Sequence, residues 1–479
     1  GMSVRRSLAA AVALAVTLAS CAAGPYPLPD LGGLYDRAAQ FDDAARNPVI
    51  VIPGILGSRL RDRESGRLVW GAFEGTYANP RAAEGARLVA LPMAIGTPLA
   101  ELRDEVEPGG VLDAVRIRLF GLPIEQAAYV FILRSLGVGG YRDESLGRSG
   151  TIRYADDHFT CFQFPYDWRR DNAENARRLH EFILEKRAYV AAELERRYGI
   201  RNRDVKFDVV AHSMGGLLLR YYLMYGDAAL PEDGSMPEVT WAGARHVENA
   251  VVVATPSAGS AEAVRNLVDG AAFSWVLPRY PAALLGTMPA LYELLPRTRH
   301  AAVVEGERAI DLFDAEEWRR RGWGLASPAA DDLLADLLPG VGPAERRAIA
   351  LDHLAKSLTR ARQFHAALDR AHALPAGLGL HLYAGDAEKT VAALEVGPEG
   401  ALAAGAFGSG DGTVLRSSAL LDERVGGAWM PRLRTPIPWS SVTFVYGDHL
   451  SLTSDPAFTD NVLYRLLESP RGAPINGPT

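Results

Sequence analysis

The chain has 479 residues, of which 48% are apolar, so it is long enough to bury a large core. Its formal net charge is −7 at pH 7, with acidic and basic residues interspersed. No cluster of Lys and Arg resembles a nucleic-acid-binding surface, which argues against a protein that binds DNA or RNA.

The N-terminus has the pattern of an export signal. Arg5 and Arg6 precede an apolar run over 7–18, which is shorter than the roughly 20 residues that a membrane-spanning helix needs. Small residues then lead to Cys21, as in a bacterial lipobox. We therefore expect residues 1–21 to direct export, and Cys21 to be lipidated and to anchor the protein to the cell envelope, on the outer-membrane or periplasmic side or at the cell surface. The alternative is ordinary cleavage near the same place, with Cys21 incidental.

The segment that follows the signal has the composition of a linker. Residues 22–46 contain three prolines and a Gly-Gly pair, and they predict a tether. With Cys21 lipidated, Cys161 has no partner for an internal disulfide. Cys161 stands in an apolar stretch, so a buried and unreactive thiol is expected there.

The first part of the core is predicted over 47–256. Residues 48–52 are a proline followed by four β-branched residues, and Pro53 comes next; this pattern is typical of a strand buried on both faces of a parallel sheet. Residues 59–150 are rich in loops and predict a lid-type insertion, with a helix at 124–136 that three glycines end. A strand is expected at 159–164. A charged helix is expected at 172–198.

Alternating strands and helices then predict the fold class. A strand at 205–211, a helix at 217–225 and a strand at 247–254 imply βαβ units and a parallel sheet. Residues 257–377 have helical periodicity and no clear strand, so they predict a helical cap. The second part of the core is predicted over 378–479, and its elements are expected at these ranges: strands at 380–384 and 441–446 and a helix at 457–467. Together these elements predict an α/β-hydrolase fold.

Residues 211–215, Ala-His-Ser-Met-Gly, have the pattern of a nucleophile elbow. In that motif a strand turns sharply into a helix, and the serine stands at the strained apex between small residues. The pattern alone is weak, but a strand is predicted before it and a helix after it. Ser213 is therefore the candidate nucleophile. The alternative is an ordinary tight turn between a strand and a helix.

A serine nucleophile needs a base, and in this fold the chain order is serine, acid, histidine. His449 lies late in the chain, in a loop directly after a predicted strand, and it is the candidate base. His212 is expected to point elsewhere on the elbow and to be structural. His381 lies inside a predicted strand and is expected to belong to the core.

The acid has two candidates. Asp411 stands in a glycine-flanked loop, Gly-Asp-Gly-Thr-Val, after the strand at 380–384, and it is preferred. Asp386, closer to the end of that strand, is the rival. Asp448 adjoins His449, and neighbouring side chains generally diverge. The acid would fix the imidazole tautomer and stabilise the imidazolium ion.

An oxyanion hole requires two backbone donors. The N–H of the residue after the nucleophile, Met214, is one candidate. The other is expected in the loop 53–58, where Ile55 is preferred and Leu56 comes next. This loop lacks the Lys-Ser/Thr of a phosphate-binding loop, and the sequence has no metal-ligand spacing, so we expect no cofactor and no metal.

Five motifs occur in the order of a known family. They are the segments 48–60, 166–169 (Tyr-Asp-Trp-Arg), 211–216, 410–414 and 448–450. Together they resemble the lecithin:cholesterol acyltransferase and lysosomal phospholipase A family, over about residues 47–467. The resemblance implies an α/β-hydrolase core with a cap and a mobile lid, and lipid esters as substrates. It also supports the same triad and the same oxyanion donors.

The resemblance also implies roles for residues around the site. Trp70 corresponds by position to a lid tryptophan that the family places near the acyl chain, although the disulfide that pins this loop in the animal enzymes is absent here. Leu56 is a second candidate for substrate contact. The segment 167–169 is expected to shape the floor of the site.

The sequence therefore predicts a serine-dependent hydrolase or O-acyltransferase that acts on lipid esters through an acyl-enzyme intermediate. Its expected partners are the lipid or acyl-ester substrate and a membrane, which it would contact through the lipid anchor and through the lid and cap. A soluble carboxylesterase is the first alternative. A non-catalytic lipid-binding protein on the same scaffold is the second.

Overall fold

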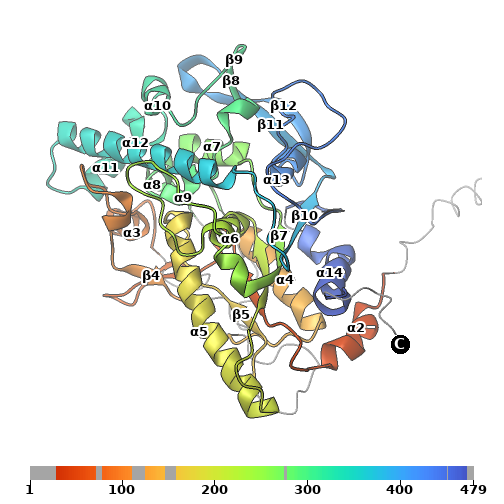
Figure 1. The fold of residues 1–479 in the computed structure, drawn as a ribbon. Coiled ribbons are helices and arrows are strands. Elements are labelled where there is room, and N and C mark those ends of the chain that lie inside the picture. Colours follow the sequence, from red (N-terminus) through yellow and green to blue (C-terminus); the bar gives the residue numbers. More distant parts are fainter. Residues whose placement is uncertain are drawn as a thin grey trace, which may run out of the picture.

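The computed structural model describes residues 28–71, 78–110, 124–145, 158–273, 278–449 and 451–471. The predicted signal segment, with Cys21, lies outside these residues. A six-stranded sheet forms the centre of the molecule, and every strand pair in it is parallel (Figure 1). In sheet order its strands are β13 (Ser441–Val445), β10 (Gly379–Gly385), β7 (Val247–Val253), β6 (Phe207–His212), β1 (Val49–Ile52) and β5 (Cys161–Gln163).

Helices cover both faces of this sheet, which is why β1 is apolar throughout. Ile50 and Ile52 point to the face covered by α5 (Asn172–Tyr198) and α6 (Met214–Tyr225). Val49 and Val51 point to the face covered by α4 (Ile124–Val138) and α14 (Pro456–Leu463). Alternate side chains thus enter two separate cores, and both sets must be hydrophobic.

The insertion after β1 is more regular than the sequence predicted. Its strands β2 (Leu60–Asp62), β3 (Leu68–Trp70) and β4 (Val106–Pro108) form a small antiparallel sheet. The short helix α3 (Ala83–Val89) packs beside β3. The strands have only three residues each, too few to show a period of two in the sequence.

The predicted cap is helical but contains strands, so the prediction that 257–377 has none is wrong. Its helices gather at one end of the molecule (Figure 1). They are α7 (Ala261–Asp269), α8 (Ala282–Leu285), α9 (Pro289–Tyr292), α10 (Ala315–Arg321), α11 (Asp331–Leu337) and α12 (Pro343–Leu368). Beside them β8 (Val303–Glu305) and β9 (Arg308–Ala309) join an unpredicted hairpin of β11 (Glu388–Val396) and β12 (Leu402–Gly410), in the order β12-β11-β8-β9. A short helix, α13 (Arg416–Leu420), follows the hairpin.

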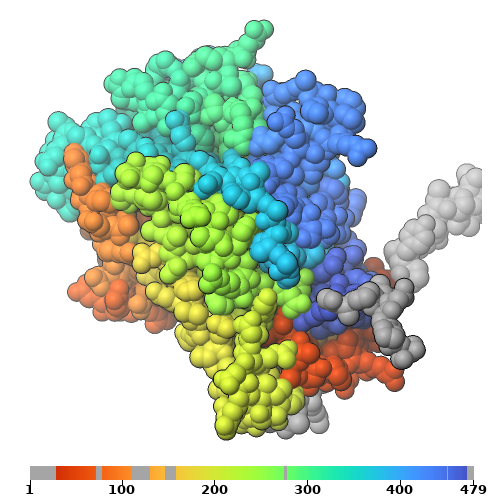
Figure 2. All heavy atoms as spheres, in the orientation of Figure 1, coloured from red at the N-terminus to blue at the C-terminus, as the bar shows by residue number. Residues whose placement is uncertain are grey.

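The prediction of a tether over 22–46 is wrong for its second half. Residues Leu31–Gln40 form helix α2, which packs against α4 and α14. The Tyr35 hydroxyl donates a hydrogen bond to the Asp460 carboxylate (2.6 Å), and Tyr35 is buried. In the space-filling view the red N-terminal residues accordingly lie against the blue C-terminal ones (Figure 2). No helix in the part of the chain that the structure describes is long and apolar enough to cross a membrane.

Glu293, which follows α9, is a buried carboxyl group beneath the start of α5. Its Oε2 accepts hydrogen bonds from the backbone N–H of Asn172 (3.0 Å) and from the Asn172 side-chain amide (2.5 Å). Burial and the nearby Asp171 carboxylate raise the pKa of Glu293 well above its usual value. The folded protein therefore holds this proton more tightly than the unfolded chain. The resulting stability is complete below the unfolded pKa of about 4.3 and is lost as the pH rises through the folded pKa.

Glu293→Gln is expected to raise the melting temperature, and by more at pH 8 than at pH 5, because a neutral amide has no proton to lose. Thermal unfolding of the variant and the wild type across this pH range measures the effect. Glu181→Gln, on the exposed face of α5, is the matched control and should leave the pH profile unchanged. A difference between Glu293→Gln and the wild type that stays constant with pH would contradict this account.

Candidate active site

Ser213 stands between the end of β6 and the start of α6, in a backbone conformation that few residues adopt. Its φ is 51° and its ψ is −126°. The strain is held by hydrogen bonds on both sides: the Ser213 N–H donates to the Val253 carbonyl oxygen (2.8 Å), and its own carbonyl accepts from the Thr255 hydroxyl (2.7 Å). Strained backbone of this kind is maintained only where the surroundings determine it, and it is common at catalytic residues.

Glycines make the sharp turn possible. A Cβ added at Gly215 would lie 2.6 Å from the Pro53 carbonyl oxygen, and one added at Gly216 would lie 2.0 Å from the Thr255 hydroxyl oxygen. A Cβ at Gly54 would meet the Ser213 Cβ at 2.9 Å. The start of α6, the end of β7 and the loop after β1 can therefore approach one another only with glycine at these positions.

His449 and Asp411 form a buried pair. The His449 Nδ1 lies 2.6 Å from the Asp411 Oδ2, and the two side chains are 5% and 2% exposed. The backbone joins them as well, because the His449 N–H donates to the Asp411 carbonyl oxygen (2.7 Å). The other carboxylate oxygen of Asp411 accepts from the amides of Thr413 (2.9 Å) and Val414 (2.7 Å).

The surroundings of Asp411 keep it ionised. Burial by itself would raise its pKa, but the adjacent His449 and the two amide donors outweigh burial and hold the pKa below its usual value. Asp386 is placed differently. Its side chain is 39% exposed, and its charged partner is Arg416, at 3.9 Å. Of the two acids that the sequence offered, the structure brings Asp411 to His449.

His212 lies closer to His449 than the sequence analysis suggested. Its ring centroid lies 5.6 Å from that of His449. The side chain is fully buried, and neither ring nitrogen has a hydrogen-bond partner in the described part of the chain. Burial lowers the pKa of His212 to about 3, so this imidazole stays neutral and packs beside His449 without competing for its proton. His381 lies within β10 and is buried, as predicted.

Aromatic donors hold the loop 53–58 in place from three sides. The Tyr166 hydroxyl donates to the Pro53 carbonyl oxygen (2.7 Å), the Trp70 indole N–H to that of Leu56 (2.9 Å), and the Trp168 indole N–H to that of Ser58 (3.1 Å). Leu56 has a φ of 65°, which only this fixed loop makes tolerable for a residue with a side chain. We call Tyr166, Trp70 and Trp168 the aromatic clamp.

The clamp directs the peptide groups of the loop. In a trans peptide group the C=O of one residue and the N–H of the next residue point in opposite directions. A hydrogen bond that fixes a carbonyl oxygen therefore also fixes the direction of the following amide. The Gly54 carbonyl also accepts, from the Gly57 N–H (3.2 Å). This leaves the Ile55 amide without a hydrogen-bond acceptor among the described residues, and the same holds for the Met214 amide at the first position of α6.

Comparisons with known proteins agree with this architecture. Residues 149–313, which include Ser213 and the clamp residues Tyr166 and Trp168, match the family model of lecithin:cholesterol acyltransferase. A chain of the Tle4–Tli4 complex superposes with a TM-score of 0.52 at 16% identity, over 89% of this chain and 99% of that one. The chain has an α/β-hydrolase fold, and its residues 149–313 are similar to the lecithin:cholesterol acyltransferase family.

Two lipases are more distant structural neighbours of this hydrolase. The mature lipase BlEst2 of Bacillus licheniformis has a TM-score of 0.32 at 13% identity, over 89% of this chain and 94% of that one. Lipase 1 of Pelosinus fermentans has a TM-score of 0.31 at 12% identity, over 89% and 99% of the two chains. The comparison with curated proteins found no match.

Trp70 of the hydrolase is buried among aromatic rings. Its ring lies edge-to-face with Trp168 (centroids 5.6 Å apart), Phe273 (5.9 Å) and Tyr280 (5.8 Å). Only 3% of Trp70 is exposed, and its one polar atom is occupied by the Leu56 carbonyl oxygen. In this structure Trp70 is therefore a support of the loop 53–58. Leu56 is fully buried as well.

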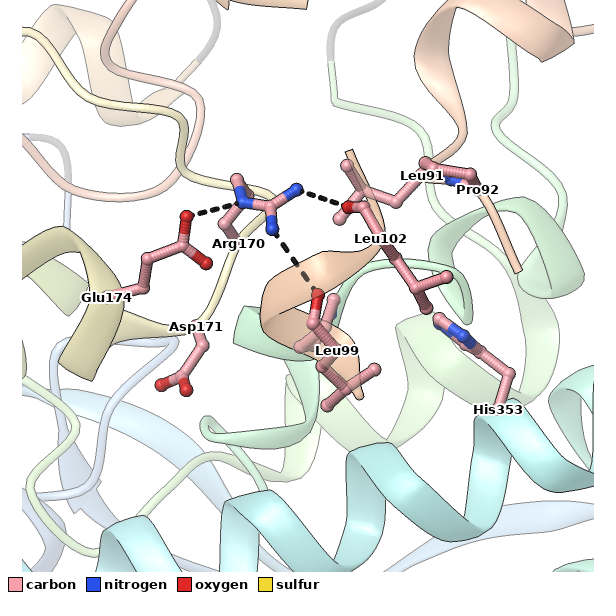
Figure 3. Close-up of a pocket in the computed structure, with 9 residues that line it drawn as sticks. Leu91, Pro92, Leu99, Leu102, Arg170, Asp171, Glu174 and His353 are labelled. Atoms are coloured by element: carbon pink, nitrogen blue, oxygen red, sulfur yellow. Dashed lines mark hydrogen bonds and ion pairs between the residues drawn. The ribbon is translucent and has the colours of Figure 1, made fainter. Parts of the chain in front are cut away.

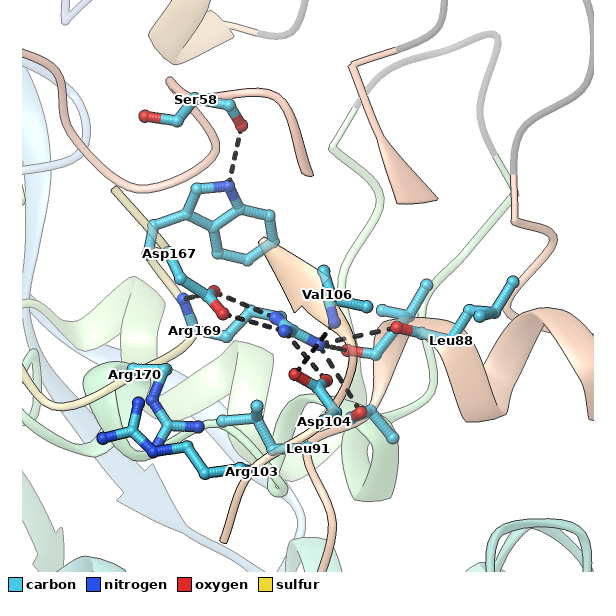
Figure 4. Close-up of polar contacts among 12 residues, drawn as sticks. Ser58, Leu88, Leu91, Arg103, Asp104, Val106, Asp167, Arg169 and Arg170 are labelled. Atoms are coloured by element: carbon cyan, nitrogen blue, oxygen red, sulfur yellow. Dashed lines mark hydrogen bonds and ion pairs between the residues drawn. The ribbon is translucent and has the colours of Figure 1, made fainter. Parts of the chain in front are cut away.

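Arg169 continues the same support into the insertion (Figure 4). Its guanidinium binds both carboxylate oxygens of Asp167 (3.0 and 2.8 Å), lies 3.0 Å from Asp104, and donates to the Val89 carbonyl oxygen (3.0 Å). The Arg169 side chain is fully buried. This network fastens the end of α3 and the start of β4 to the segment that carries Trp168.

Arg170 makes a parallel attachment beside a small pocket (Figure 3). It binds Glu174 on α5 (2.8 Å) and the carbonyl oxygens of Leu102 (2.8 Å) and Leu99 (3.4 Å). His353 of α12 also lines this pocket. The contacts of Arg170 connect the insertion to α5, and His353 of the cap lines the same pocket. The pocket therefore lies where these three parts of the chain meet.

Tyr166 is the site residue whose role the sequence did not suggest. The floor of the site was predicted for the segment 167–169, without Tyr166, and the hydroxyl contact of Tyr166 to the loop after β1 crosses 113 positions of the chain. The available signal was the motif itself, since a buried Tyr and a buried Trp each need a hydrogen-bond acceptor.

Proposed function

We propose that this hydrolase acts on acyl esters of lipids, with Ser213 as nucleophile, His449 as general base and Asp411 as the acid that orients His449. The observation that carries the proposal is the buried Asp411–His449 pair, 2.6 Å apart, in a chain whose Ser213 has the strained backbone of a nucleophile elbow. The family match supports the class of substrate.

The reaction begins with attack of the Ser213 hydroxyl oxygen on the ester carbonyl carbon, while His449 takes the hydroxyl proton. The oxygen of the tetrahedral intermediate becomes negatively charged. The Ile55 and Met214 amides, which have no other acceptor among the described residues, donate to it. Asp411 stabilises the imidazolium form of His449 and keeps its proton on Nδ1.

Collapse of the intermediate breaks the ester bond and leaves an acyl-enzyme. His449 gives its proton to the departing alcohol oxygen. Water or a second alcohol then attacks the acyl-enzyme by the same steps in reverse order, so the product is a free acid or a new ester. Phospholipase A and acyltransferase activity differ only in this acceptor.

A series of esters with graded acyl chains, together with phospholipid vesicles, tests the substrate class. We expect the value of kcat/KM to rise from short to long acyl chains, and fatty acid or a transferred acyl ester to be released from phospholipid. A steady fall of kcat/KM with chain length would contradict the lipid substrate and favour a soluble carboxylesterase. No turnover of any ester by folded protein would favour a non-catalytic binding protein.

Trp70→Phe is expected to lower kcat about 10-fold with little change in KM. The ring is kept, but the hydrogen bond from the indole N–H to the Leu56 carbonyl oxygen is lost, and such a bond contributes about 0.5–1.5 kcal/mol to holding the loop in place. Steady-state kinetics on a short and a long ester measures the effect. Should Trp70 instead contact the acyl chain, the variant would raise KM for the long ester alone.

Trp318→Phe is the matched control for this prediction. Trp318 is also a buried indole whose N–H donates to a backbone carbonyl oxygen, that of Leu312 (2.7 Å), but it lies in the cap. Its loss should lower the melting temperature and leave kcat unchanged. Equal effects of the two substitutions on kcat would show that the Trp70 contact has no special role.

The proposal extends to the N-terminus, where we infer that the Cys21 thiol carries lipid and holds the enzyme at the cell envelope. The motif at 18–21 and the class of substrate support this inference. Incorporation of labelled fatty acid, together with membrane fractionation, tests it. Labelling should be lost in Cys21→Ser, and persistence of the label in that variant would overturn the inference.

A further inference from the structure

Residues 426–434, Gly-Gly-Ala-Trp-Met-Pro-Arg-Leu-Arg, form a loop in which all nine residues are exposed. We call it the Trp429 loop. Trp429 is 83% exposed, Met430 is 46% exposed and Leu433 is 40% exposed. Large apolar side chains gathered on one short loop, in water, mark a surface that contacts something else.

The charges of the loop have one sign. It contains Arg432 and Arg434 and no acidic residue. Neither arginine forms an ion pair with any residue in the described ranges, whereas the acids nearest in sequence, Asp422 and Glu423, are already paired with Arg424 (2.8 Å) and Arg299 (2.5 Å). The loop thus presents free cations beside an exposed indole.

The base of the loop is rigid and is tied to the half of the molecule that holds Ser213. The Glu423 N–H donates to the Arg434 carbonyl oxygen (2.7 Å), which closes the loop. Glu423 binds Arg299, and Arg299 shares Asp369 with Arg297. Arg297 in turn donates to the Ser257 carbonyl oxygen (3.0 Å), just past the carboxyl end of β7. In a parallel sheet the carboxyl ends of β6 and β7 lie at the same edge.

We propose that the Trp429 loop docks the protein on a phospholipid surface that carries negative charge. Trp429, Met430 and Leu433 enter the interfacial layer, where tryptophan is favoured because its ring is apolar and its N–H stays near water. Arg432 and Arg434 bind lipid phosphates and extend their apolar stems along the surface.

The charge of the loop favours a lipid over a protein as the occupant. Arg432 and Arg434 have no ion pair with any described residue, and the loop contains no acid. Its charge therefore complements a surface of uniformly negative phosphates. The identity of the lipid ester that is cleaved after docking rests on the proposed function. The docking itself needs no catalysis.

The test uses the full chain with Ser213→Ala, which prevents hydrolysis, and with Cys21→Ser, which removes the anchor. Binding to phosphatidylcholine vesicles with and without phosphatidylglycerol is measured by sedimentation. We expect tighter binding to the anionic vesicles, lowered about 30-fold by Arg432→Gln with Arg434→Gln and lowered at least 10-fold by Trp429→Ala with Met430→Ala. Brominated lipids should quench tryptophan emission, and Trp429→Phe should remove most of that quenching.

Matched controls keep the number of charges and exposed rings equal. Arg63→Gln with Arg319→Gln removes two arginines whose side chains are 60% and 61% exposed, and Phe41→Ala removes a 64% exposed ring. These controls should bind as the parent does. Equal binding by the loop variants and the controls would overturn the proposal. So would a concentration-dependent dimer that Trp429→Ala abolishes while vesicle binding stays unchanged, because the occupant would then be a protein.

The two proposals fail separately in this design. With Ser213 intact, the loop variants should hydrolyse a short soluble ester at the parental rate. If binding does not depend on the loop but the ester is turned over, the docking surface is wrong and the proposed function stands. If binding depends on the loop but no ester is turned over, the docking surface stands and the proposed function is wrong.

Discussion

Asp411→Asn is expected to lower kcat about 10,000-fold, while Asp386→Asn stays within about twofold of the wild type. An amide at position 411 can donate to His449 Nδ1, and this favours the tautomer in which Nε2 carries the proton and cannot accept the one from Ser213. In a serine protease the same substitution has an effect of about this size. Steady-state hydrolysis of a soluble ester measures both variants.

The Asp386→Asn variant is the matched control, since it makes the same chemical change 25 residues earlier in the chain, on a carboxylate that is 39% exposed. Both variants should keep the melting temperature within a few degrees of the wild type, because each keeps the shape of the side chain. If Asp386→Asn has a greatly reduced kcat and Asp411→Asn keeps the wild-type kcat, the acid is Asp386 and the assignment of Asp411 is wrong.

Arg169→Met is expected to destabilise the fold by about 3–5 kcal/mol. The guanidinium is fully buried between Asp167 and Asp104, so its removal leaves a buried and a partly buried carboxylate without a counter-charge. Burial already raises the pKa of Asp104. Chemical denaturation measures the loss, with Arg319→Met as control. Arg319 is 61% exposed, and the loss of its pairing with Glu316 should leave the stability almost unchanged.

Adding Asp104→Asn and Asp167→Asn to Arg169→Met should restore part of the lost stability, because the cost comes from unpaired charge. The clamp residue Trp168 adjoins Arg169, so the single variant should also lose activity beyond what its unfolded fraction explains. If Arg169→Met has the same free energy of unfolding as the wild type, this network does not stabilise the fold.

The sequence predicted the central sheet well because its strands are short apolar runs that end at turn residues. The runs at 48–52 and 247–254 became β1 and β7 with ends shifted by one residue. The helix predicted at 172–198 has those bounds, since Asp171 caps its start and Gly199 ends it in a left-handed conformation.

The hairpin β11–β12 could not be predicted from its pattern. β12 reads Leu-Ala-Ala-Gly-Ala-Phe-Gly-Ser-Gly, and Ala and Gly give neither β propensity nor alternation. This hairpin decides the acid, because it carries the chain away from β10 and returns Asp411 to the end of that strand, where a Cβ at Gly385 would meet the Asp411 Cβ at 2.8 Å. Sequence proximity to the strand made Asp386 the rival candidate, but the preferred Asp411 is the acid that lies beside His449.

The aromatic clamp shows a different limit. Its donors, Trp70, Tyr166 and Trp168, are visible in the sequence, but their acceptors are backbone carbonyl oxygens, which every residue has. Which carbonyl oxygen accepts the hydrogen bond of a buried indole N–H is therefore known only from the folded structure. The lid role of Trp70 was predicted from its position alone, and the hydrogen bond to Leu56 adds a role in holding the loop.

Reaction with a fluorophosphonate ester, followed by mass spectrometry of the labelled peptide, tests the central claim most directly. The probe should modify the wild-type enzyme once, on Ser213. The label should be absent in Ser213→Ala, and its formation should be strongly slowed in His449→Ala. Detergent or lipid is included so that the site is open to the probe. Label on another serine, or no label on well-folded wild-type protein under these conditions, would contradict Ser213 as the nucleophile.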